Sequence, residues 1–131
     1  MSTAVPPSFT ALLLLAHGSP EPGWSAPFEA IRDLVRELHA GGTVALGFLP
    51  PATPDFMQAM EALVLGGARC VRIVPLFLAR GGHVNRDLPA MAEAARARWG
   101  IEVTVAEVLG ESAVLREAIA QWAAGHGAKG A

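Results

Sequence analysis

The chain has 131 residues, of which 52% are hydrophobic and 17% charged, and its formal net charge is -2. These values predict one globular domain with a sizeable core and exclude a disordered chain. Because no Lys/Arg cluster accompanies the small net charge, nucleic-acid binding is not expected. Cys70 is the only cysteine, which excludes an intramolecular disulfide and a thiolate metal cluster, and we expect a buried, inert thiol.

The two ends of the chain carry little structural signal. Residues 1–9 are expected to form a loose lead-in and residues 125–131 a frayed tail, with a single domain at residues 10–124. Met1 to Thr10 lacks the basic region of a secretory signal, and the apolar run that follows is far shorter than the roughly 20 residues that cross a bilayer. We therefore expect a cytoplasmic protein without a membrane partner.

The first apolar run, Thr10 to Ala16, predicts a strand that stops at His17. A helix should follow, capped by Ser25 and ended by the glycine pair at positions 41 and 42. Its apolar residues recur at helical spacing, which predicts one face packed on the sheet. The residues expected on that face are Phe28, Ile31, Leu34, Val35 and Leu38.

The second apolar run, Thr43 to Leu49, predicts a strand that is closed by a proline pair beginning at Pro50, since proline has no ladder donor. Thr53 is expected to cap the next helix, with Pro54 at its first position. A glycine pair at positions 66 and 67 should end that helix. The residues expected on its buried face are Phe56, Met57, Met60, Leu63 and Val64.

The third apolar run, Val71 to Leu78, predicts a strand buried on both faces of a sheet, and it ends in a glycine-rich loop. We expect the next helix from about Arg86 to Arg98, capped by Asn85. Pro89 would then lie in its first turn, where backbone N–H groups lack partners in any case.

The last predicted elements are a strand from Ile101 to Val105 and a helix from about Ser112 to Ala124. Strands that alternate with helices predict an α/β fold, with a parallel sheet, helices on both faces and right-handed crossovers. We expect a single-domain, flavodoxin-like three-layer sandwich whose four parallel strands have the order 2-1-3-4. The residues expected on the packed face of the last helix are Leu115, Ala118, Ile119 and Trp122.

Two histidines follow the carboxyl ends of predicted neighbouring strands, His17 after the first and His83 after the third. Parallel strands lie about 4.8 Å apart, and ligands of such sheets bind beyond the carboxyl ends. Imidazole binds Co, Ni, Fe, Cu or Zn, and neutral imidazole accepts a proton near pH 7. The two positions therefore predict a shared crevice for a metal or a proton, the alternative being surface or capping histidines. His39 and His126 are interpreted as structural or incidental.

Arg80 and Arg86 flank the glycine pair Gly81 and Gly82. Glycine permits close backbone approach, and a helix N-terminus follows, which together suit a carboxylate or phosphate. An anionic ligand is therefore expected here, and solvated or ion-paired arginines are the alternative. Because neither GxxxxGK[ST] nor GxGxxG occurs, a nucleotide is not favoured. The three tryptophans are interpreted as packing residues, and Trp24 alone lies in a loop where it could stack on a flat ligand.

The His17-Gly18-Ser19 element and the run PLFLARGGHVNRDLP at residues 75–89 resemble the small CbiX-type sirohydrochlorin chelatases. The resemblance covers nearly the whole chain, including GFL at residues 47–49. It implies a metal-inserting lyase that acts without ATP and places a divalent metal in sirohydrochlorin, during cobalamin and related tetrapyrrole biosynthesis. Co²⁺ is the expected metal, with Ni²⁺ or Fe²⁺ in related branches; the metal is a substrate, and no permanently bound cofactor is expected.

The resemblance also implies roles for individual residues. His17 and His83 would be the catalytic pair, holding the metal or accepting a pyrrole proton. The residues expected to contact the carboxylates of the macrocycle are Ser19, Arg80, Gly81, Gly82 and Arg86. Because these short members look like half of the longer two-domain chelatases, a homodimer is expected.

This chain departs from the family pattern at two positions. Family members usually have a glutamate directly after the second strand, where this chain has Pro50. They often have a second acidic residue just before the next proline, where this chain has Thr53. One interpretation is that the two histidines suffice, with Glu21, Asp55 or a carboxylate of a partner chain as substitute. A second is a protein that binds tetrapyrrole or metal without inserting one into the other. The remaining interpretations are activity on another tetrapyrrole or metal, and a purely structural relative.

Overall fold

The computed structural model describes residues 10–39, 42–79 and 81–128, with the backbone alone at residues 82–85. The strands are β1 (Ala11–Ala16), β2 (Val44–Phe48), β3 (Cys70–Pro75) and β4 (Glu102–Val105). The α-helices are α1 (Ala26–Leu38), α2 (Phe56–Leu65), α3 (Gly82–Trp99) and α4 (Ala113–Gly125). A short 3-10 helix, η1 (Leu109–Glu111), precedes α4.

The strands form one parallel sheet in the order β2-β1-β3-β4, which confirms the predicted fold class and strand order. In the middle of β1, Leu14 pairs with Leu46 of β2 and Val74 of β3. The central strand is therefore hydrogen-bonded on both sides, as its continuous apolar sequence predicts. His17 follows β1 directly, so it lies at the carboxyl edge of the sheet, between the ends of two neighbouring strands.

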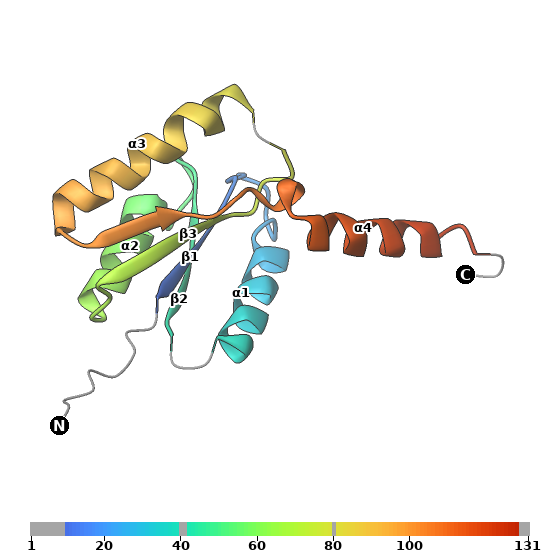
Figure 1. The fold of residues 1–131 in the computed structure, drawn as a ribbon, viewed down its shortest axis with the longest axis horizontal. Helices are drawn as coiled ribbons and strands as arrows, with labels where there is room; N and C mark the ends of the chain where they lie inside the picture. Colours follow the sequence, from blue (N-terminus) through green and yellow to red (C-terminus); the bar gives the residue numbers. More distant parts are fainter. Residues whose placement is uncertain (1–9, 40–41, 80, 129–131) are drawn as a thin grey trace.

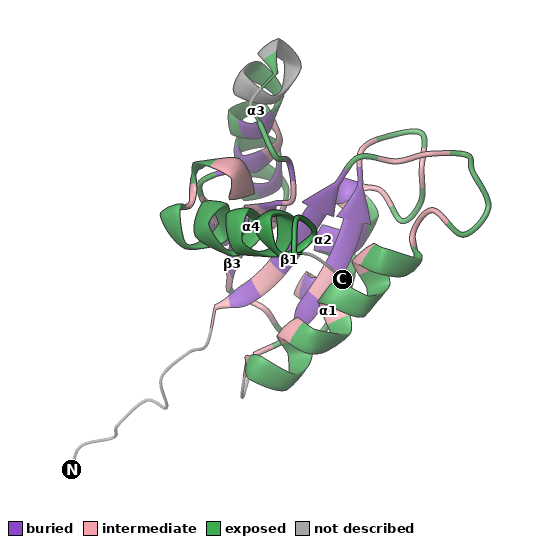
Figure 2. Ribbon diagram, turned by 90° about the vertical axis from the view of Figure 1, so that its right-hand side faces the viewer, coloured by how far each residue is buried: buried purple, intermediate pink, exposed green. Residues whose placement is uncertain are grey.

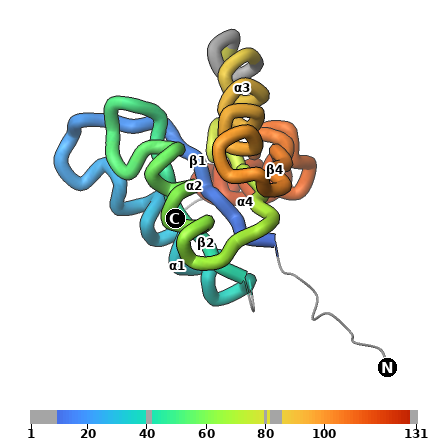
Figure 3. The backbone as a smooth tube through the Cα atoms, turned by 90° about the vertical axis from the view of Figure 1, so that its left-hand side faces the viewer, coloured from blue at the N-terminus to red at the C-terminus, as the bar shows by residue number. Residues whose placement is uncertain are grey.

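Two clusters of buried side chains lie on opposite faces of the sheet. Helices α2 and α3 cover one face, and α1 covers the other over β2 (Figures 1 and 3). The larger cluster joins β1, β3 and β4 to α2 and α3, and its fully buried members include Leu13, Met60, Ile73 and Ala95. The smaller cluster lies beneath α1 and holds Leu14, Ala16, Val44, Leu46 and Phe48. Trp24 packs against the smaller cluster and Trp99 against the larger, as predicted.

Helix α2 begins after Asp55, and the predicted cap at Thr53 is wrong. The Asp55 carboxylate accepts a hydrogen bond from the backbone N–H of Gln58 at 2.9 Å, and the Gln58 side chain accepts one from the Asp55 N–H. This reciprocal capping box satisfies two backbone donors, which a threonine two residues earlier cannot do. Pro54 stays outside the helix because its carbonyl accepts a hydrogen bond from Phe48 of β2.

Strand β3 and helix α3 also differ from their predicted bounds. The strand ends at Pro75 rather than Leu78, because β1, the partner strand, ends at the same level. The helix begins at Gly82, with Gly81 in an extended conformation as its N-cap, so Asn85 lies inside the helix instead of capping it. Pro89 is consequently an interior residue, where the helix loses one backbone hydrogen bond.

Two predicted packing faces are solvent-exposed in the structure. Every residue of α4 is exposed (Figure 2), so its expected packed face has no partner among the described residues. Trp122 is 69% exposed rather than packed. In α1, Phe28 and Val35 are half-buried while the other three expected residues are exposed. Both helices have an apolar stripe that the described part of the chain leaves uncovered. None of the described helices is long and apolar enough to cross a membrane.

Two smaller sequence expectations concern side chains near the amino end of the sheet. The His39 ring lies 2.7 Å from the Thr10 carbonyl through Nε2, which confirms a structural role. The thiol of Cys70 is half-buried rather than buried, and it contacts Thr10 and Glu102, because β3 begins at this residue and the strand end is open. Neither residue belongs to the carboxyl edge of the sheet.

Candidate functional site at the carboxyl edge of the sheet

His17 is exposed, and its ring packs on a buried side chain from the segment that follows the neighbouring strand, β3. The centroids of the His17 and Phe77 rings are 4.5 Å apart, with the ring planes tilted by 49°. Phe77 is only 3% exposed and lies in the segment that follows β3. The imidazole is therefore held by an apolar platform where the ends of β1 and β3 meet, with solvent access for a ligand.

Gly18 brings the loop after His17 into close contact with the loop after β2. A Cβ atom at this position would overlap the Cβ of Ala52 and lie 2.9 Å from the carbonyl oxygen of Leu49. Leu49 in turn donates its backbone N–H to the carbonyl of Ala16 at 2.9 Å. Glycine is required here by close approach, and this packing fixes the backbone on both sides of His17.

A cavity of about 710 Å³ opens beside His17, between the ends of β1 and β2 and helices α2 and α3. A volume of this size is typical of small-molecule sites. Its surface is largely apolar, and the ionisable residues among the described ones that line it are His17, Asp55 and Asp87. The other lining residues are Leu49, Pro50, Phe56, Met57, Ala90, Met91 and Ala94. The arrangement suits a large, flat, mostly apolar ligand that is met by a few polar groups at the sheet edge.

Pro50, the position of the absent acid, lines this cavity, and so do two carboxylates from other elements. Asp55 was considered from the sequence as a substitute, and it shares the cavity with His17. Its carboxylate also caps α2, which fixes its position. Glu21, the other substitute in this chain, instead lines a separate pocket of about 300 Å³ together with Ser19 and Trp24.

Asp87 lines the cavity, although no role at the site was predicted for it from the sequence. The signal that identifies it is helical spacing. Positions 87, 90, 91 and 94 of α3 all line the cavity, and they recur at the three- and four-residue intervals of one helix face. Position 83 lies four residues before Asp87 on the same helix, within this periodicity.

The remaining predicted residues do not share one location. Arg80 lies outside the described residues, and so do the side chains at positions 82–85, which include His83. Gly81 is the N-cap of α3, and Gly82 is its first residue. Arg86 is exposed on α3 and is not among the residues that line the cavity. The Ser19 hydroxyl accepts a hydrogen bond from the Glu21 N–H at 3.1 Å, in the smaller pocket.

No group of three or more His, Cys, Asp or Glu side chains that would hold a metal occurs among the residues whose side chains the structure describes. The described donors around the cavity are His17, Asp55 and Asp87. The prediction that His17 and His83 form a pair stays a prediction, because the His83 side chain lies outside that description.

The fold and the cavity define an α/β protein with a ligand site beyond the carboxyl ends of its parallel strands. The family model for CbiX matches residues 11–124, and the chain belongs to the CbiX family. Among curated relatives, the Sirohydrochlorin cobaltochelatase of Methanopyrus kandleri is 35% identical over 81 residues, which are 62% of this chain and 57% of that protein. The protein of the same name from Saccharolobus solfataricus is 30% identical over 106 residues, 76% of this chain and 81% of that protein.

Two solved structures share the fold. The crystal structure of a putative cobalamin biosynthesis CbiX protein from Marinobacter aquaeolei has a TM-score of 0.80 at 30% identity and covers 89% of this chain and 93% of that one. The sirohydrochlorin chelatase SirB from Bacillus subtilis subspecies spizizenii, solved in complex with cobalt, has a TM-score of 0.77 at 22% identity. That match covers 88% of this chain and 50% of SirB, so one copy of the present fold corresponds to half of SirB.

Proposed function

We propose that this protein inserts a divalent metal, with Co²⁺ as the physiological ion, into sirohydrochlorin. The observation that carries the proposal is the position of His17, which follows the central strand and lines a largely apolar cavity beside two carboxylates, in a member of the CbiX family. Curated relatives of the chain bear the name Sirohydrochlorin cobaltochelatase, although the match to the first of them spans little more than half of that protein.

Metal insertion requires groups that bind the ion and groups that take up protons. As M²⁺ enters the macrocycle it loses water, and two pyrrole N–H protons leave. The neutral imidazole of His17 is suited either to hold the ion or to accept a proton. Asp55 and Asp87 line the same cavity and supply carboxylates for the second task, which would replace the acid absent at Pro50.

The tetrapyrrole is anionic, and its recognition would combine the apolar cavity with donors at its rim. The ring system would pack on the apolar residues of α2 and α3, while the peripheral carboxylates would meet the N-terminus of α3 and the arginines at positions 80 and 86. Ser19, in the neighbouring pocket, is a further donor for the rim. His83 is proposed as the second histidine because its position shares the helical periodicity of Asp87.

The test is direct. Purified protein is mixed with sirohydrochlorin and Co²⁺, and the absorbance change of the macrocycle is followed against a protein-free control, with Ni²⁺ and Fe²⁺ in parallel. We expect acceleration that is greatest with Co²⁺. Rates equal to the control for all three ions would refute the proposal.

The second candidate function is a protein that binds tetrapyrrole or metal without inserting one into the other, and Pro50 is the observation that favours it. This candidate predicts tight binding of sirohydrochlorin with negligible turnover. Pro50→Glu separates the two candidates, because a large gain in rate would identify the absent carboxylate as the limiting group. Because proline also shapes the turn, the folding of the variant is checked first, and a circular dichroism spectrum like that of the parent would establish it.

We also propose that two copies pair. The chain matches half of SirB, and two copies would supply the second half that the longer protein carries in one chain.

A further inference from the structure

The His17 ring makes no hydrogen bond to any residue that the structure describes. In metal-binding histidines, a carboxylate or a backbone carbonyl of the protein commonly accepts a hydrogen bond from the second ring nitrogen and thereby fixes the orientation of the ring. The contact found at His17 is aromatic instead, with Phe77 at a centroid distance of 4.5 Å and a tilt of 49° between the ring planes. An apolar neighbour therefore occupies the place that a hydrogen-bond acceptor usually has.

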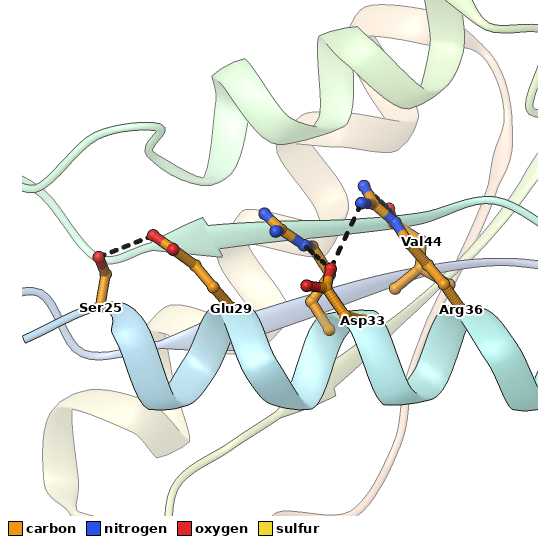
Figure 4. Close-up of polar contacts among 6 residues, drawn as sticks. Ser25, Glu29, Asp33, Arg36 and Val44 are labelled. Carbon is orange, nitrogen blue, oxygen red and sulfur yellow. Dashed lines mark hydrogen bonds and ion pairs between the residues drawn. The ribbon is translucent and has the colours of Figure 1, made fainter.

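Other polar side chains beside the sheet are oriented by backbone carbonyls. The Arg36 guanidinium donates to the Val44 carbonyl from Nε at 3.3 Å and from Nη2 at 3.0 Å (Figure 4). Nε2 of His39, the other histidine next to a strand, lies 2.7 Å from the Thr10 carbonyl. His17 differs from both side chains, because the group that orients it is a ring.

Phe77 is itself held on both sides along the chain. The residue before it, Leu76, donates its N–H to the Leu15 carbonyl at 2.8 Å, so the pairing with β1 continues past the end of β3. The residue after it, Leu78, has its carbonyl against η1, where a Cβ atom at Gly110 would overlap it. The Phe77 ring is 3% exposed and belongs to the larger core cluster. It is therefore a fixed surface against which a neighbouring ring can be oriented.

The orientation of the His17 ring matters for its chemistry. Rotamer preference alone does not fix the plane of an imidazole, because the torsion that turns the ring has broad minima. The lone pair of a ring nitrogen lies in that plane, so turning the ring moves the point at which a metal ion or a proton is bound. The backbone of His17 is already held, since Gly18 lies against Ala52 of the loop after β2. The side chain is what remains free, and the contact with Phe77 restricts it.

We propose that Phe77 is a positioning residue for His17, whose imidazole plane it sets for the metal ion or the proton that His17 binds. Phe77 is not among the residues that line the cavity, so it acts through His17 and not on the tetrapyrrole. The inference rests on the proposed function for its effect on the rate of metal insertion. Its effect on the ring and on Co²⁺ binding can be measured without insertion, which keeps the two proposals separable.

The test is a double-mutant cycle. Phe77→Leu removes the ring and keeps an apolar side chain, and Phe77→Met is a second variant whose flexible side chain fills irregular gaps. Both changes are made in the parent and in His17→Ala. Phe28→Leu is the matched control, because it removes a ring that lies 4.7 Å from that of Trp24, away from the cavity.

Four quantities are measured. They are kcat and KM for sirohydrochlorin with Co²⁺, the affinity for Co²⁺ alone by isothermal titration calorimetry, the chemical shifts of the imidazole protons, and nuclear Overhauser contacts between the His17 and Phe77 rings in the parent. Circular dichroism establishes that each variant is folded.

In the parent background, both Phe77 variants are expected to lower kcat by about 10- to 100-fold, the range for loss of a group that orients a metal-binding histidine. KM should change little, because Phe77 does not line the cavity, and the imidazole protons should shift. Phe28→Leu should retain the kcat and the imidazole shifts of the parent. In His17→Ala the Phe77 changes should have no further effect, since a residue that acts through His17 then has nothing to orient.

A parent without contacts between the two rings would overturn the proposal, whether or not the variants fold. A folded Phe77 variant that keeps the parent kcat would overturn it too, as would an equal loss of rate in the His17→Ala background. An inert parent that binds Co²⁺ refutes metal insertion alone, and the same cycle is then taken on Co²⁺ affinity, where additive losses would overturn the role of Phe77. A parent that neither inserts nor binds Co²⁺ overturns both proposals.

Discussion

At the scale of single residues, His17 combines a fixed backbone with an accessible ring. Its backbone is held by the close approach of Gly18 to the β2 loop, and its ring packs on Phe77. Because the residue is exposed, removing its side chain deletes a ligand or proton acceptor without leaving a cavity in the core.

His17→Ala is expected to lower the rate of metal insertion by about 10² to 10⁴-fold, the range associated with the loss of a general base. The melting temperature should change little, since the side chain is exposed. His126→Ala, outside the cavity, serves as the control and should retain the rate of the parent. The measurement is initial rate against sirohydrochlorin with Co²⁺, and a retained rate in His17→Ala would remove this residue from the mechanism.

Asp55 has two roles that one substitution can separate. Asparagine is as good a helix cap as aspartate, so Asp55→Asn keeps the start of α2 while it removes the carboxylate from the cavity. We expect slower insertion with little loss of stability, and Asp87→Asn provides the comparison from α3. If both variants insert the metal at the rate of the parent, neither carboxylate replaces the acid absent at Pro50.

At the scale of elements, α2 shows how burial divides neighbouring residues of one helix. Leu63 is 5% exposed and packs in the core, whereas Leu65, two residues later, is 80% exposed. The helix is positioned by this buried face and by the capping box at Asp55, and it carries Phe56 and Met57 to the cavity. The stability of α2 therefore bears on the shape of the site.

Leu63→Ala should reduce the free energy of unfolding by about 2–5 kcal/mol, because it removes buried apolar atoms and leaves a cavity. Leu65→Ala makes the same chemical change on the exposed side, and its effect should stay within about 0.5 kcal/mol. Urea titration followed by circular dichroism measures both. Equal losses in the two variants would contradict the assignment of the buried face.

At the scale of the whole molecule, the exposed apolar side chains of α1 and α4 bear on the proposed pairing of two copies. A pairing that covers these side chains would remove from water apolar surface that a single chain leaves exposed. Stability would then include a contribution from the partner, and that contribution depends on protein concentration.

The melting temperature of the parent is accordingly expected to rise as protein concentration increases over two orders of magnitude. Ile119→Glu, on the exposed apolar stripe of α4, should lose this dependence, whereas Ala124→Glu, on the other side of the same helix, should retain it. Differential scanning calorimetry at several concentrations provides the measurement. A melting temperature independent of concentration in the parent would indicate that folding is complete within one chain.

Much of the local structure followed from the sequence. The apolar runs and their alternation with helices predicted the strands of a buried parallel sheet, and the likeness to flavodoxin-like sheets predicted their order. His17 was correctly placed at the carboxyl edge for the same reason. Boundaries were less well predicted: Asn85 is a better cap than Gly81 by residue type, yet α3 begins earlier, and Pro89 is tolerated inside it.

The sequence by itself determined the sheet, its order and the strand end that bears His17, since these depend on local patterns of apolar residues and chain-breaking residues. Only the tertiary structure decided which groups share the cavity. Asp87 joins His17 because α3 begins at Gly82 and turns that face toward the sheet edge, while Glu21 falls in a separate pocket. The tertiary structure also decided that α4 leaves the domain, because the contact of Gly110 with Leu78 fixes a direction that the apolar stripe of α4 does not encode.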